Sequence, residues 1–147
     1  MTMRGKGFFM VGSAGLALGG LLHLSSQLGH GDIPLTRAAV EAAMRAYKIE
    51  MMGMTFSLKD VMDAWGISFG VLAIFGGAQN LVTVSLLPRS AGLGVLSATS
   101  ALASAVLLGV AISYHIAPPI VVFSSVFACF AAATFLELRQ GTGASGA

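Results

Sequence analysis

Two histidines and two aspartates stand near the ends of long apolar runs, where ionisable side chains can carry chemistry. His23 and His115 each lie toward one end of such a run, and Asp60 and Asp63 lie just before another, next to Trp65. Ionisable groups at membrane depth are costly to bury and mark functional sites by default. These five residues are the candidate ligand-binding residues of the chain.

Three interpretations of the two histidines stay open. Imidazoles that face each other across a helix bundle can supply both axial ligands of a b-type haem, so haem b is the cofactor hypothesis. His23 with a nearby aspartate can instead line a pocket for a quinone or another lipophile, or transfer a proton. In the third interpretation, His23 and His115 make headgroup or interhelix hydrogen bonds near the membrane interface.

The segment from Tyr47 to Gly66 is rich in methionine and in charge, with four of the eight methionines and five of the fourteen charged residues. Thioethers favour copper(I), but the spacing matches no regular Met-rich array. Filling of irregular gaps between a surface helix and a bundle is the simpler interpretation. His30 and Asp32, in "GHGD", give only a weak metal hypothesis, and we predict no metal site.

Catalytic sequence patterns are missing around these residues. The chain has no CxxC, no HExxH, no phosphate-binding glycine loop and no Ser/His/Asp set at a recognisable spacing. The single cysteine, Cys129, lies in an apolar run, which is typical of a small core residue. The sequence leaves enzymatic activity undecided and favours a non-catalytic protein.

The composition is that of a membrane protein. Of 147 residues, 56% are hydrophobic and only 10% are charged, which is too little charge to cover the surface of a soluble domain. The net charge is +2 and no basic cluster occurs, so the chain has no electrostatic footprint for nucleic acid.

Four segments reach the length of about 20 mainly apolar residues that a membrane-crossing helix needs. They are residues 8–28, 65–87, 91–116 and 118–138. The first follows Arg4 and Lys6 as a signal peptide would, but it is long and lacks a small-residue cleavage site, so we expect a retained anchor. Prolines at the two later breaks leave short links, which make the last three spans antiparallel neighbours.

The loop between the first two spans is predicted to hold an amphipathic surface helix over residues 36–52, ended by Gly53. Its apolar stripe consists of Val40, Met44, Tyr47 and Met51. Glu41 and Arg45 have the spacing of an ion pair on the opposite face. Ser57 and Asp60 then fit a capping box, so the second spanning helix should begin near Leu58.

The predicted fold class is all-α: a four-transmembrane-helix bundle with one amphipathic surface helix between spans one and two. Residues 1–138 would form a single membrane domain, and residues 139–147 a disordered tail. Gln79 and Asn80, deep in the second span, should bond to a neighbouring helix. A stripe of small residues follows the third span: Ser97, Ala101, Ala105, Gly109 and Ser113. It indicates helix packing, either within the bundle or with another chain.

The stretches "AMRAYKIEMMGMTFSLKDVMDAWGISFG" and "IAPPIVVFS" resemble an uncharacterised family of small bacterial four-span integral membrane proteins. The resemblance covers the first loop, the second span and the last hairpin. It implies a four-span fold and no activity. One departure is "DAWG", where the family pattern has the aromatic residue and the acid in the other order, which leaves the role of Asp63 open.

The orientation rests on Lys and Arg near the span ends. One side carries Arg4, Lys6, Arg89 and Arg139 in short segments, and the other carries Arg37, Arg45, Lys48 and Lys59 in one longer loop. The counts tie, but short flanks orient spans more strongly. We therefore predict cytoplasmic termini in a bacterial inner membrane.

These observations favour an integral membrane packing or accessory protein, non-catalytic, as a small subunit of a larger membrane complex. Its partners would be the lipid bilayer and another membrane protein or a second copy of the chain. The alternative is a haem-, quinone- or lipophile-binding membrane protein. Its site would lie at the outer rim, the end of the bundle away from the termini. Transport would require an oligomer, because four spans carry little buried charge.

Overall fold

The protein consists of four long helices, one short helix and a small hairpin in a computed structural model that describes residues 3–29, 35–86 and 92–143. The elements are α1 (Met3–Leu28), α2 (Leu35–Ala46), β1 (Lys48–Met51), β2 (Met54–Ser57), α3 (Leu58–Leu86), α4 (Leu93–Ser113) and α5 (Ala117–Gly143). Helices α1, α3, α4 and α5 are long and apolar enough to cross a membrane. The all-α fold class with four spanning helices and a short amphipathic helix is confirmed.

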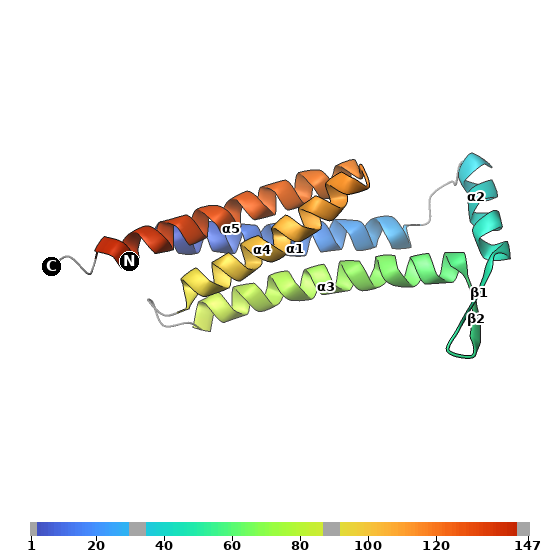
Figure 1. Cartoon of the computed structure of the whole chain (residues 1–147), viewed down its shortest axis with the longest axis horizontal. Helices are drawn as coiled ribbons and strands as arrows, with labels where there is room; N and C mark the ends of the chain where they lie inside the picture. Colours follow the sequence, from blue (N-terminus) through green and yellow to red (C-terminus); the bar gives the residue numbers. More distant parts are fainter. Residues whose placement is uncertain (1–2, 30–34, 87–91, 144–147) are drawn as a thin grey trace. The chain divides into compact units, whose positions relative to one another are not determined.

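The chain divides into two compact units, Gly20–Leu72 and the combination of Met1–Gly19 with Ala73–Ala147. We call the latter the four-helix unit, because it contains α4, α5 and parts of α1 and α3. Helices α4 and α5 run side by side in this unit (Figure 1). Pro118 and Pro119 fall in the first turn of α5, where a proline costs no helical hydrogen bond.

The core of the four-helix unit is small and apolar. It consists of Phe9, Val84, Leu93, Val126, Phe130 and Ala133. The rings of Phe9 and Phe130 lie 5.2 Å apart between their centroids, which joins α1 to α5. Helix α1 also meets α5 along glycines: a Cβ on Gly19 would lie only 2.8 Å from Val122. Small residues thus allow these helices to approach closely.

The other unit, which we call the hairpin unit, corrects the predicted surface helix. Helix α2 ends at Ala46, six residues early, and β1 and β2 pair antiparallel after it. Met52 and Gly53 form the turn, with φ of 53° and 77°, as a two-residue type I′ turn requires. Gly53 therefore turns a hairpin and does not end a helix. Figure 1 shows this hairpin leading from α2 into α3.

The structure also differs from two smaller predictions. On α2, Glu41 accepts a hydrogen bond from Arg37 Nε at 3.0 Å and is not paired with Arg45. Helix α5 continues to Gly143, so the predicted disordered tail starts at least five residues too early. Residues 144–147, His30, Asp32 and the link with Pro88 lie outside the described residues.

Candidate functional site

His23 is engaged by the helix that it faces. Its Nε2 lies 3.0 Å from the carbonyl oxygen of Gly66 on α3. Because a carbonyl oxygen only accepts, Nε2 must carry the proton. The ring also meets Phe69 edge-on, with centroids 5.3 Å apart and an interplanar angle of 83°. An iron bond to Nε2 would require the loss of this interhelix hydrogen bond.

Glycine makes this contact between α1 and α3 close. A Cβ on Gly70 would lie 3.3 Å from the carbonyl oxygen of Gly20 and 3.4 Å from Cδ2 of His23. A Cβ on Gly66 would lie 3.1 Å from the side chain of Gln27. The hairpin unit therefore places His23, with its interhelix hydrogen bond, in a tight helix–helix contact.

Asp60 forms the predicted capping box at the start of α3. Its Oδ2 accepts hydrogen bonds from the backbone N–H of Ser57 at 3.0 Å and from Ser57 Oγ at 2.6 Å. The backbone N–H of Asp60 donates to Ser57 Oγ at 3.1 Å in return. Ser57 is also the last residue of β2 and is paired with Lys48. The hairpin thus ends on the residue that caps the helix.

Asp63 has a partner of its own on α3, and Trp65 is exposed. Both carboxylate oxygens of Asp63 accept from Lys59 Nζ one turn earlier on α3. Trp65 is 76% exposed, as is common for tryptophan at a membrane interface. Asp60 and Asp63 are each held by a partner within four residues, and His23 by Gly66 on α3. No hydrogen bond among the described residues joins these three side chains to one another.

His115 occupies a special backbone position after α4. Its φ is 54°, in the left-handed region. Its N–H donates to the carbonyl of Ile112 at 3.0 Å, and that of Ile116 donates to Ala111 at 3.0 Å. This pair of bonds is the Schellman motif that ends many helices, in which glycine usually takes the left-handed position. His115 belongs to the four-helix unit and His23 to the hairpin unit, so their predicted convergence at the outer rim stays a prediction.

The small-residue stripe on α4 is buried at one end only. Ser97 is fully buried, and Ala101 and Ala105 are half-buried. Gly109 and Ser113 are exposed, and a Cβ on Gly109 would meet nothing within 4 Å. Part of the stripe packs within the four-helix unit, while its last turns stay uncovered by the described residues.

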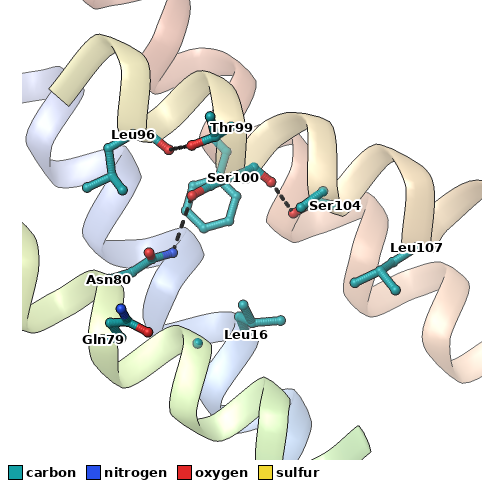
Figure 2. A pocket seen from close by; sticks show the side chains of 11 residues that line it. Leu16, Gln79, Asn80, Leu96, Thr99, Ser100, Ser104 and Leu107 are labelled. Atoms are coloured by element: carbon teal, nitrogen blue, oxygen red, sulfur yellow. Dashed lines mark hydrogen bonds between the residues drawn. The ribbon is translucent and has the colours of Figure 1, made fainter. Parts of the chain in front are cut away.

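A cavity of about 320 Å³ opens between the helices of the four-helix unit. Figure 2 shows Asn80 reaching from α3 toward Ser100 on α4, with Gln79 beside it. Asn80 Nδ2 donates to Ser100 Oγ at 3.4 Å, so the predicted bond to a neighbouring helix forms. Leu16 of α1 and the buried Phe130 of α5 contribute apolar wall. This cavity does not include any of the five candidate ligand-binding residues.

Glu137 is an acidic residue that the sequence analysis missed. Its Oε1 is buried on α5 and has no hydrogen-bond partner within the described part of the chain. A Cβ on Gly5 would lie 2.5 Å from that oxygen, so glycine in the first turn of α1 makes room for the carboxyl group. Its position inside the last apolar span was the available signal, because an ionisable residue within a span is a candidate functional residue.

Comparison with family models, with curated proteins and with solved structures finds no match to this chain. Over residues 3–29, 35–86 and 92–143, no three His, Cys, Asp or Glu side chains come together as a group that could hold a metal ion.

Proposed function

We propose that the chain is a non-catalytic accessory protein of the membrane, a small subunit that docks on a transmembrane helix of another protein. The observation that carries this proposal is that the small-residue stripe on α4 is buried at one end and exposed at the other. Ser97 is fully buried, whereas further along the same stripe Gly109 is exposed, and a Cβ there would meet nothing within 4 Å. Small residues let helix backbones approach closely in a bilayer, where lipid tails gain little from them.

The engagement of the ionisable residues supports a structural role. His23 joins α1 to α3, Asp60 caps α3, and Asp63 pairs with Lys59 on one helix. Each group thus stabilises a helix contact or a helix start. A haem with His23 as an axial ligand through Nε2 would have to break the bond to Gly66, whereas the structural role keeps it.

The test is the composition of the native particle after extraction in a mild detergent through a C-terminal tag. We expect other membrane subunits to co-purify in a fixed ratio. Gly109→Leu should release them, because leucine fills the open space at the stripe. Val95→Leu is the matched control, since Val95 lies on the same helix and is 72% exposed. A wild-type protein that purifies alone, or Gly109→Leu particles of unchanged composition, would refute the accessory function.

The proposed location is a bacterial inner membrane with both termini in the cytoplasm. The Lys and Arg residues in the short flanks support this orientation. Alkaline phosphatase fused to the C-terminus should be inactive, and green fluorescent protein fused there should fluoresce. An active phosphatase fusion and a non-fluorescent green fluorescent protein fusion would show the opposite orientation.

A further inference from the structure

The cavity in the four-helix unit lies well inside the span. Asn80 is six residues from the end of α3, and Ser100 is seven residues past the start of α4. At 1.5 Å per residue, both lie about 10 Å from their helix ends, which is hydrocarbon depth for a spanning helix. Polar groups at this depth cannot rely on bulk water for hydrogen bonds.

Most hydroxyl groups of the cavity are already satisfied. Thr99 Oγ1 donates to the carbonyl of Leu96 at 3.0 Å, and Ser104 Oγ donates to that of Ser100 at 2.8 Å. Ser100 differs, because its Oγ accepts from Asn80 and its own proton has no acceptor among the described residues. The cavity therefore keeps one free hydroxyl donor.

Gln79 has more unpaired hydrogen-bonding groups than Ser100 does. Its side chain lines the cavity and is exposed at the surface of the protein, and no hydrogen bond joins its amide to another described residue. The Asn80 side chain uses one of its two N–H groups in a long bond and leaves Oδ1 free. An amide without a partner in an apolar environment loses several kcal/mol relative to water, on the order of 2 to 7. A bound molecule that forms hydrogen bonds with these amide groups would remove that penalty.

The walls define the chemistry of such a molecule. None of the residues that line the cavity is charged, so an ionised headgroup would stay uncompensated at this depth. Leu16, Leu96, Leu107 and Phe130 provide an apolar lining. The free N–H groups of Gln79 and the hydroxyl of Ser100 are donors, which suit an acceptor oxygen such as a carbonyl. The volume of about 320 Å³ is at the lower end for ligand pockets.

We propose that this cavity binds a neutral, lipid-soluble molecule that carries a carbonyl oxygen, with Gln79 and Ser100 as its hydrogen-bond donors. The carbonyl oxygen can belong to a quinone ring or to the acyl ester of an uncharged lipid. The site is distinct from the outer-rim residues and from the stripe at Gly109, so it does not depend on the accessory function.

The test is binding to delipidated protein in detergent, with decyl-ubiquinone and dioleoylglycerol as separate probes. One of them should raise the midpoint of thermal unfolding of the wild type. Gln79→Leu should weaken that binding by about tenfold or more, the effect of one lost buried hydrogen bond. The same variant should be at least as stable as the wild type without ligand, because the unpaired amide is gone. Gln27→Leu, which replaces an amide outside the cavity, should bind the probe as the wild type does.

Ala103→Leu tests the same site by volume. Ala103 lines the cavity and is exposed, so leucine fills space without removing a hydrogen bond. Loss of binding in both variants supports the site, and the probe that binds identifies the source of the carbonyl. The proposal fails if neither probe binds the wild type. It also fails if the folded Ala103→Leu or Gln79→Leu protein binds with unchanged affinity.

Discussion

A Cβ atom on Gly77 of α3 would lie 2.6 Å from the carbonyl oxygen of Ser13 on α1 and 2.7 Å from the backbone nitrogen of Ala17. Both neighbours are backbone atoms, which cannot turn aside as a flexible side chain can. Glycine at this position therefore sets the spacing of α1 and α3 in the four-helix unit. The adjacent Gly76 lines the cavity, so the same crossing also shapes the proposed binding site.

Gly77→Ala should destabilise the protein by about 2 kcal/mol or more, because overpacking forces helix backbones apart. The measurement is the free energy of unfolding in mixed micelles titrated with a denaturing detergent. Gly7→Ala on α1 is the control, since its Cβ would meet nothing within 4 Å. That variant should be neutral or up to about 1 kcal/mol more stable, because alanine is the better helix former. Equal effects of the two substitutions would contradict the close crossing.

His23→Phe should lower the free energy of unfolding by about 1 kcal/mol, the usual net value of one intramolecular hydrogen bond. Phenylalanine keeps a ring against Phe69 but cannot donate to the Gly66 carbonyl. His23→Gln is the comparison, because its amide can still donate, and it should lose less stability. If His23→Phe is as stable as the wild type, the interhelix bond contributes nothing in the membrane.

The spans and the capping box could be predicted because their signals are local. About twenty apolar residues in succession predict a helix that is long enough to cross a membrane, wherever the rest of the chain lies. Ser57 and Asp60 are only three residues apart, and their reciprocal hydrogen bonds mark the start of the helix. The start of α3 at Leu58 could therefore be predicted without knowledge of the tertiary structure.

The hairpin was missed because a short apolar stripe fits two periods. Tyr47 and Met51 continue the helical spacing of α2, yet they belong to the chain that turns back at Met52 and Gly53. The two-residue turn before "MTFS" was the available signal for a hairpin. Methionine is unusual in such a turn, which favours asparagine or glycine, and this masked the pattern.

The cavity and Glu137 depend on how the helices are rotated, which the sequence does not show directly. Asn80 was expected to meet a neighbouring helix, but its partner Ser100 and the unpaired Gln79 beside it follow only from the packed faces. Likewise, Glu137 is half-buried, and its Oε1 is buried beside Gly5. Residues that meet across separate helices carry no common sequence motif.

Ser57→Ala should cost about 1 kcal/mol, the usual loss when an N-cap side chain is removed. Ser57 Oγ both accepts from the N–H of Asp60 and donates to its carboxylate, so Ser57→Ala and Asp60→Ala should be non-additive in a double-mutant cycle. Ser68→Ala, at an exposed serine of the same helix, is the control. Additive losses would show that the capping box does not act as a unit.

His115→Gly should stabilise the protein by about 1 kcal/mol, because a non-glycine residue in the left-handed region is strained. The measurement is again unfolding in mixed micelles. Tyr114→Gly is the matched control, since Tyr114 has a φ of −96° and gains nothing from glycine. That control should be neutral or less stable than the wild type. If His115→Gly is the less stable variant, the imidazole makes a contact that outweighs the backbone strain. The same result, together with a change in the visible spectrum, would favour His115 as a haem ligand.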